Sequence, residues 1–198
     1  MNITEKFNFL LTALSNPSRL QGMAMGQQFP LFIADYPIKE HNRMQKMITN
    51  LTIQLQQQGI SVKTVNLYDE AVKVLKQNNL DDYLSQEPEI DKKGLLDEFS
   101  RILNDDLVKR NPFIKLDKEY DFLFVTDVGA VFPYVRIHNI IENLQNHIQG
   151  VKVLVVFFPG EYKRDNNNGS HLSLFSIFDD AYYRAMNIFN ITLERKGE

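Results

Sequence analysis

The chain has 198 residues, of which 43% are hydrophobic and 24% charged, and its formal net charge is −3. This length suits one globular domain with a full core, and the slightly acidic balance gives no general attraction to nucleic acid or anionic lipid. The absence of cysteine excludes disulfides, thiolate nucleophiles, iron–sulfur clusters and cysteine zinc sites.

The N-terminal segment MNITEKFNFLL has neither a basic region nor a small-residue cleavage site, so no signal peptide is predicted. No apolar run approaches the ~20 residues needed to span a bilayer. We therefore expect a cytoplasmic protein.

The first third of the chain predicts helices alternating with strands. Apolar residues at helical spacing predict one helix up to Leu14, stopped by Asn16-Pro17, and another from Met44 to Leu55, closed by Gly59. The remaining expected segments are a loop containing Gly22 and Gly26, a buried strand at Leu31–Asp35 ended by Tyr36-Pro37, and an edge strand at 60–65.

The next segment predicts two helices around a loop. Residues 68–80 have a helical pattern, and Leu95, Phe99, Ile102, Leu103 and Leu107 restore that spacing before Asn111-Pro112 breaks it. Between them, residues 81–94 are acidic and contain Pro88, which predicts a mobile loop.

Residues 120–158 predict a βαβ unit. The apolar run Phe122–Val125 is typical of a strand buried on both faces. A turn at Thr126–Gly129 follows, and Pro133 enters a helical pattern whose apolar stripe comprises Ile137, Ile140, Ile141, Leu144 and Ile148. The run Val151–Phe158, ended by Pro159-Gly160, predicts a second, parallel strand.

The C-terminal part predicts less regular structure. Residues 163–170 are polar with three consecutive asparagines, and a loop is expected there. Residues 172–189 are strongly aromatic and predicted to be partly helical, and Ile191–Leu193 are a candidate last strand.

Together these elements predict a single α/β domain over residues 1–198, with an open, mainly parallel sheet of four or five strands and helices on both faces, in Rossmann-like layering. With the strands numbered along the chain, we expect the order 2-1-3-4. In such sheets ligands and partners meet the loops beyond the carboxyl ends of the strands. That order would bring Asp35 and Asp127 close together.

Sequence motifs for nucleotide chemistry are missing: the chain has no P-loop and no GxGxxG. Asp35 and Asp127 could hold Mg²⁺, although helix capping is the favoured explanation for acids at strand ends. Glu161-Tyr162-Lys163 resembles half of a nuclease ExK site, but it follows Pro-Gly, where a loop is expected. A metal- or nucleotide-dependent enzyme, a phosphohydrolase or nuclease using Asp35, Asp127 and Glu161, is thus the alternative function.

Several other polar residues have a possible structural role as well as a possible functional one. His138 and Glu142 share a helix face, where a surface hydrogen bond is favoured over a zinc site. Arg136 lies in the first turns of its predicted helix, where the dipole disfavours a cation. Either a local acid such as Asp127 or an anionic group on a partner could explain it. Tyr162, Tyr182, Tyr183 and Arg184 combine the residue types enriched at interface hot spots.

Three runs carry a resemblance to a known family: TDVGAVFPYVRIHNIIENLQ (126–145), VVFFPGEY (155–162) and LSLFSIFDDAYYRAMNIF (172–189). Taken together and in this order, they resemble the BrxB family of bacterial BREX phage-defence systems. The link after Pro-Gly-Glu-Tyr is longer here than in the family pattern, and Ala181 replaces the usual asparagine before Tyr-Tyr-Arg.

The resemblance implies a small, non-catalytic assembly or adaptor protein without a cofactor, acting with other BREX subunits. The alkaline-phosphatase-like PglZ protein is the partner that it implies first, and neither nucleic-acid nor membrane binding is expected. The candidate partner- or ligand-binding residues are Asp35, Asp127, Gly129, Pro133, Tyr134, Arg136, His138, Pro159, Gly160, Tyr162, Tyr182, Tyr183 and Arg184.

Overall fold

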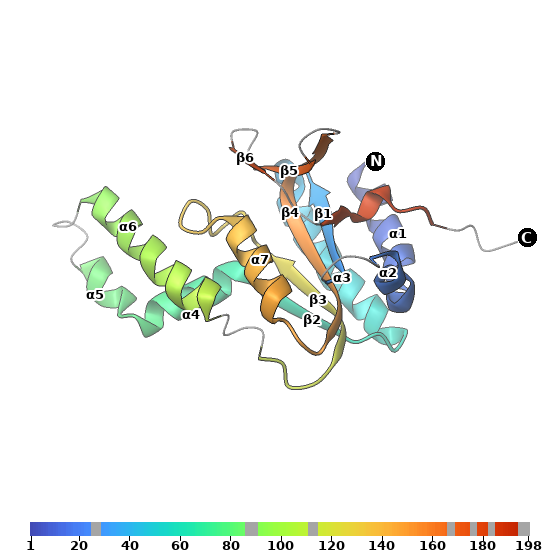
Figure 1. The fold of residues 1–198 in the computed structure, drawn as a ribbon, viewed down its shortest axis with the longest axis horizontal. Helices are drawn as coiled ribbons and strands as arrows, with labels where there is room; N and C mark the ends of the chain where they lie inside the picture. The colour runs from blue at the N-terminus through green and yellow to red at the C-terminus, as the bar shows by residue number, and fades with distance from the viewer. Residues whose placement is uncertain are drawn as a thin grey trace, which may run out of the picture.

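The fold is organised around a mixed sheet with helices on both faces (Figure 1). The structure is a computed structural model, and it describes residues 1–24, 29–85, 91–110, 115–165, 169–174, 178–181 and 185–193. Its strands are β1 (Leu31–Tyr36), β2 (Val62–Asn66), β3 (Tyr120–Thr126), β4 (Val151–Asp165), β5 (Gly169–Leu174), β6 (Phe178–Ala181) and β7 (Met186–Asn187).

Five strands form a parallel sheet in the order β2-β3-β4-β1-β7. The predicted α/β class, with an open and mainly parallel sheet, is confirmed, and so is the edge position of β2. The predicted order 2-1-3-4 is wrong, because β4 lies between β3 and β1. The helix after β3 returns the chain beside β3, and the apolar run Val153–Phe158 of β4 suits the most buried position.

Beyond the parallel sheet, β4 continues as one arm of an antiparallel hairpin. Gly160–Asp165 pair with β5, and β5 pairs with β6. Since β4 is shared, the hairpin stands over the carboxyl ends of the parallel strands.

The helices begin and end at residues that their sequences explain. Asn2 and Glu5 form a capping box at the first helix, Asn66 and Asp91 accept hydrogen bonds at two further N-termini, and Gly59 (φ +80°) follows another helix. The helices are α1 (Ile3–Leu14), α2 (Pro17–Met23), α3 (His41–Gln57), α4 (Leu67–Gln77), α5 (Leu80–Ser85), α6 (Lys92–Ile102) and α7 (Ile137–His147), with the 3₁₀ turns η1 (Ile38–Glu40) and η4 (Ile188–Asn190) and the π-helical turn η2 (Leu103–Lys109).

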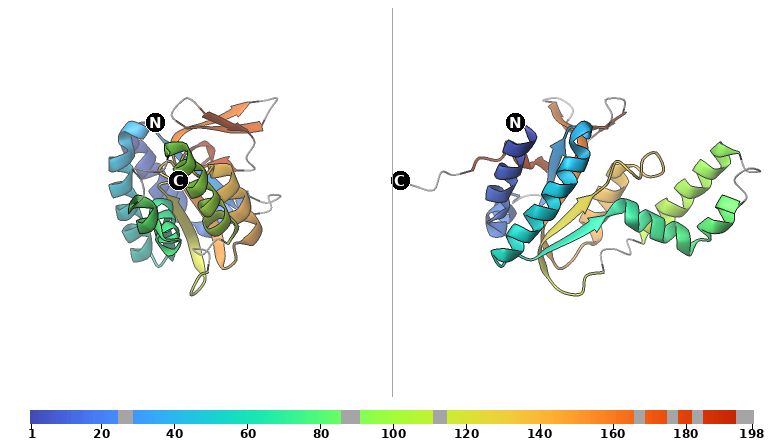
Figure 2. Two further views of the ribbon diagram at one scale, coloured as in Figure 1. Left: turned by 90° about the vertical axis from the view of Figure 1, so that its left-hand side faces the viewer. Right: turned by 180° about the vertical axis from the view of Figure 1, so that it is seen from behind.

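Two hydrophobic cores lie on opposite faces of the sheet, as the end-on view shows (Figure 2). Neighbouring residues of one strand enter different cores: Phe32 packs with α1 and α3, and Ile33 packs with α4, η2 and α7. This arrangement explains why the runs at 31–34, 122–125 and 153–158 are continuously apolar instead of alternating. None of the helices within the described ranges is long and apolar enough to cross a membrane.

Several predictions for the N-terminal half and the centre need correction. Gly22 lies in α2, and Gly26 lies outside the described residues. The loop predicted over 81–94 is wrong at both ends, because Asp81 and Asp82 begin α5 and Asp91 caps α6. Acids that suggested a loop therefore stand at helix N-termini, where they are favourable.

The C-terminal half also departs from the predictions. The loop expected at 163–170 is wrong for 163–165 and 169–170, which belong to β4 and β5. The aromatic stretch forms strands where it is described, apart from η4, and Ile191–Leu193 form none. Pro133 precedes α7 instead of entering it, and its peptide bond is cis.

We predict that Gly160→Ala destabilises the protein by about 1–3 kcal/mol, as overpacking does. A Cβ there would overlap the main-chain oxygen of Ser173 and lie 2.5 Å from Cε1 of Phe158. Chemical denaturation measures the loss.

The matched control is Gly22→Ala, because a Cβ at Gly22 meets nothing within 4 Å. Gly22 lies in α2, so alanine should raise stability by up to about 1 kcal/mol. Equal effects of the two substitutions would show that close contact at Gly160 is not the cause.

Candidate functional site at the carboxyl ends of the strands

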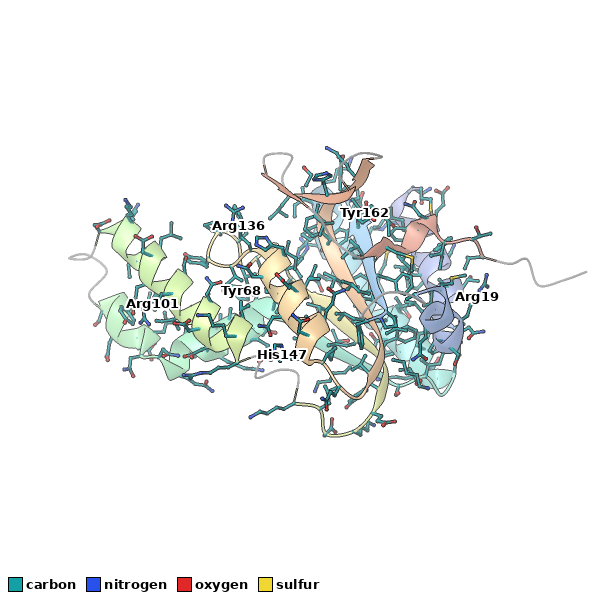
Figure 3. All side chains as sticks on the ribbon, viewed as in Figure 1. Arg19, Tyr68, Arg101, Arg136, His147 and Tyr162 are labelled. Atoms are coloured by element: carbon teal, nitrogen blue, oxygen red, sulfur yellow. The ribbon has the colours of Figure 1, made fainter. Side chains whose placement is uncertain are left out.

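The loops after β1, β3 and β4 meet at one edge of the sheet. Tyr36 pairs with Pro159 in the register of β1 and β4, and a Cβ on Gly129 would approach Cγ of Pro159 to 2.8 Å. Figure 3 places Tyr162 and Arg136 at this end of the molecule. The carboxyl ends of these parallel strands thus lie at one edge of the sheet, as their parallel pairing requires.

Asp35 joins the N-terminal helix to the start of the hairpin. Lys6 Nζ donates to the Asp35 main-chain oxygen at 2.6 Å and to its Oδ1 at 2.8 Å, and the Tyr162 main-chain N–H donates to Oδ2 at 3.1 Å. Only 14% of the Lys6 side chain and 15% of the Asp35 side chain are exposed. The ammonium also lies 4.2 Å from the ring centroid of Phe189, a cation–π distance. The Lys6–Asp35 pair thus connects α1, β1 and β4, and Lys6 also contacts η4.

Asp127 joins β3 to the beginning of α3. Its backbone has φ +56°, its Oδ1 lies 3.2 Å from His41 Nε2, and its Oδ2 accepts from Gln45 Nε2 at 2.9 Å and Thr126 Oγ1 at 3.1 Å. Asp tolerates the left-handed conformation better than most residues because its short polar side chain bonds locally. Both carboxylate oxygens are therefore engaged inside the protein.

A buried phenol extends this network. Tyr36 has no exposed surface, and its hydroxyl lies 3.0 Å from His41 Nδ1. Placing the imidazole proton on Nε2 lets His41 donate to Asp127 and accept from Tyr36, which satisfies all three groups. The result is a Tyr36–His41–Asp127 chain from β1 through α3 to β3.

The Tyr36–His41–Asp127 hydrogen-bond network has the connectivity of an activated nucleophile. The pKa of its phenol, however, is shifted in the direction that opposes this function. Burial first, and the Asp127 charge second, raise the pKa of Tyr36 well above its ordinary value of 10.0. A nucleophile or general base needs a pKa shifted toward neutrality instead. The Tyr36–His41–Asp127 network is best explained as a structural contact between β1, α3 and β3.

The three carboxylates of the enzyme hypothesis belong to different environments. Asp35 and Asp127 lie in separate clusters with β4 between their strands, and Glu161 is exposed beside Lys163, 3.5 Å from its Nζ. Among the described residues, no three His, Asp or Glu side chains come together as a metal site. The expected approach of Asp35 to Asp127 on neighbouring strands is wrong, because it depended on the order 2-1-3-4.

A hollow of ≈ 430 Å³ opens over the ends of β1 and β4. Ile38, whose side chain is 46% exposed, lies on its wall. The other lining residues are Met1, Lys6, Asp35, Tyr36, Pro37, Lys39, Pro159, Gly160, Glu161 and Ser173. This exposed apolar surface lies beside Lys6 and Asp35, whose charges are paired with each other. Such a surface suits contact with a protein.

The remaining predicted residues take varied positions. The Tyr162 hydroxyl donates to the Ala185 main-chain oxygen at 2.9 Å, and the Tyr134 ring lies 6.1 Å from that of Phe99. Pro133 and Arg136 are exposed, Arg136 as the N-cap of α7, and His138 is half-buried on its first turn. Tyr182, Tyr183 and Arg184 lie outside the described residues.

The sequence prediction missed Lys6, His41 and Gln45. His41 and Gln45 are spaced i, i+4 and therefore share one face of α3. That spacing could have indicated that the two residues contact a common partner. Lys6 carried none, because its partner Asp35 is 29 residues away in sequence.

We predict that Asp127→Asn lowers the free energy of unfolding by about 1–3 kcal/mol. Asparagine accepts the left-handed backbone, but its NH₂ must face either the His41 or the Gln45 donor. Denaturant unfolding measures the change. Asp105→Asn is the control, since Asp105 is substantially exposed beside Lys109, and a loss there as large as that at Asp127 would refute the network.

A second prediction concerns alkaline stability. Because the pKa of Tyr36 is higher in the folded protein than in the unfolded chain, its contribution is complete below about pH 10 and is lost as pH rises further. One such group removes about 1.4 kcal/mol of stability per pH unit there.

Tyr36→Phe should therefore weaken the protein at neutral pH and decline less steeply between about pH 10 and 11. Unfolding measured across this range tests the slope. The control is Tyr68→Phe, which removes a hydroxyl from a residue that is 52% exposed. Parallel slopes for wild type and Tyr36→Phe would contradict the buried phenol's role.

Comparison with known proteins shows where the chain belongs. It is 29% identical to the BREX protein BrxB of Bacillus cereus (strain H3081.97) over 198 residues, covering 95% of this chain and 98% of that relative. It is 24% identical to the BREX protein BrxB of Escherichia coli O9:H4 (strain HS) over 172 residues, covering 85% and 82%. No solved structure matches. The family model "BREX protein BrxB" matches residues 63–188, which contain the β3–α7–β4 unit, and the chain therefore belongs to the BrxB family of BREX phage-defence proteins.

Proposed function

We propose that this chain is a non-catalytic adaptor that assembles other subunits of its BREX system at the carboxyl ends of the strands. The observation that carries the proposal is the internal engagement of the acids at that edge. Asp35 is held by Lys6 and the Tyr162 main chain, and Asp127 by His41 and Gln45. A catalytic acid or metal ligand must instead present a free oxygen to its substrate or ion.

The surface beside these acids supports protein contact. Exposed Ile38 borders the hollow over β1 and β4, and Pro159 and Gly160 form part of its wall. An apolar centre with a polar rim is the usual composition of a protein interface. We infer that a partner subunit covers this hollow.

The proposed partner is the PglZ phosphatase-like protein, as the family resemblance implies. The enzyme alternative, with Asp35, Asp127 and Glu161 as catalytic acids, is weaker because these residues lie in three different environments. The acidic net charge of −3 also favours a protein partner over DNA.

Arg136 is the candidate polar contact at the same edge. It is exposed at the N-cap of α7, where a cation opposes the helix dipole. Asp127, the local acid considered for it, already has both oxygens engaged by His41, Gln45 and Thr126. Its exposure at this edge makes Arg136 a candidate contact for an anionic group on the partner.

We expect Arg136→Ala to reduce co-purification of the PglZ protein by about tenfold or more, the effect of losing an interface hot spot. The melting temperature should barely change, because the side chain is exposed. Affinity purification from cells with the complete defence system, followed by a phage plating assay, measures both effects.

Arg110→Ala is the matched control, since Arg110 is also an exposed arginine, paired with Asp106 at 2.8 Å. Full defence and co-purification with Arg136→Ala would remove this residue from the interface. Failure of the wild-type chain to retain any BREX subunit would refute the adaptor function itself.

A further inference from the structure

Two helices project from the sheet, and of their described residues only Ile102 and Tyr83 belong to or pack against one of its cores. Figure 1 shows α5 and α6 extending away from the sheet beyond α4, and the reverse view in Figure 2 shows the same projection. No residue of α5 is buried, and the buried residue of α6 is Ile102, at the end nearest the sheet. We refer to Leu80–Ser85 together with Lys92–Ile102 as the projecting arm.

The projecting arm has an apolar face with little cover. Leu84 is 50% exposed, and the other large apolar side chains are only half-buried: Leu80, Tyr83, Leu95, Leu96 and Phe99. Their spacings of i, i+3 and i+4 within each helix place them in stripes. Such a stripe is normally buried, and short helices are marginal without that burial.

The two helices touch through few specific contacts. The Tyr83 ring lies edge-on to Phe99 at a centroid distance of 5.8 Å, and the Tyr83 hydroxyl donates to Glu98 Oε1 at 3.0 Å. These contacts fix α5 against α6, but they leave Leu84 largely in solvent. Leu84 is therefore the most exposed large apolar side chain of the arm.

The charge of the chain is concentrated in the surrounding segment. Residues 67–110 contain eleven acidic and seven basic residues, a net charge of −4, so the rest of the chain carries +1. Arg101, the arm's arginine labelled in Figure 3, is paired with Glu98 at 2.6 Å. Asp81, Asp82 and Asp97 have no ion-pair partner within the described parts of the chain.

We propose that the projecting arm binds a basic amphipathic helix presented by another protein of the defence complex. The proposal rests on the adaptor function and adds a second surface, away from the carboxyl ends of the strands. The occupant's apolar stripe covers Leu84 and Phe99, as in helix-in-groove recognition, and its lysines or arginines lie opposite Asp81 and Asp82.

The same charge argues against other occupants. Nucleic acid and anionic lipid surfaces carry negative charge and would be repelled. A second copy would bring together two 67–110 segments, each with a net charge of −4, which also costs free energy. A basic protein helix satisfies both the apolar face and the charge.

Site-specific photocross-linking tests the occupant directly. The photoreactive residue p-benzoylphenylalanine replaces Leu84 in the full chain, expressed with the complete defence system. The control position is Ile53 on α3, which is 49% exposed. Mass spectrometry should find position 84, and not position 53, joined to a segment with excess Lys and Arg and helical apolar spacing. No cross-link at position 84, a cross-link to a second copy, or an acidic segment would overturn the proposal.

Substitutions give the matching quantitative test. Leu84→Ser with Asp81→Asn and Asp82→Asn should weaken retention of the cross-linked protein by about tenfold or more. Ile53→Ser with Glu119→Gln, changes at exposed residues outside the arm, should leave it unchanged. If the arm variant retains every BREX subunit as well as the wild type does, the proposal that the arm binds a partner is refuted, while the adaptor function stands. If the wild-type chain retains no subunit, the adaptor function fails first.

Discussion

Burial of β4 on both faces is the constraint on which the rest of the fold depends. Val153 to Phe157 have no exposed surface, and successive residues enter the two cores in turn. The strand pairs with β3 on one side and β1 on the other, and then continues into the hairpin with β5. One strand thus determines the sheet order, both cores and the position of the strand-end loops.

The central position of β4 separates the two acids at the strand ends, and each of them holds a helix against the sheet. With β4 between β1 and β3, Asp35 and Asp127 are not on neighbouring strands, and each engages a helix: α1 through Lys6, and α3 through His41 and Gln45. Buried charges need such partners because an uncompensated charge in the interior is costly. These internal contacts hold the acids in place before any partner binds, which suits a surface that a partner must recognise.

The sequence predicted the parts of the fold that depend on local patterns. The β3–α7–β4 unit, the helix closed by Gly59 and the edge position of β2 follow from apolar periodicity, capping and crossover rules. The strand order could not be predicted, because it depends on which strand best fills the centre. The aromatic C-terminal stretch was misinterpreted since Leu172 and Leu174 fit a strand, whereas the wider aromatic spacing suggested a helix.

The candidate site shows the same division between local and distant information. The position of the strand-end loops at one edge follows from the parallel pairing of the strands. By contrast, the Lys6–Asp35 pair joins residues 29 apart, and the His41–Asp127 contact joins the start of α3 to the end of β3. Sequence patterns report helix faces and strand faces, but they do not report which polar groups meet across the fold. For this reason the acids suggested metal chemistry, and only their partners indicate a structural role.

The two surfaces of the molecule differ in how they are stabilised, and this difference bears on assembly. The strand-end edge is supported by both cores, with Tyr36 and Phe158 almost fully buried beneath it. The projecting arm has no buried residue beyond Ile102 and depends on contacts such as Tyr83 with Phe99. Segments with few buried contacts open locally at low free energy. A partner helix on the arm would therefore supply both affinity and the packing that α5 and α6 lack, so that binding at this surface is coupled to its ordering. In the proposed adaptor role, one partner would lie on the strand-end edge and a second would complete the packing of the projecting arm.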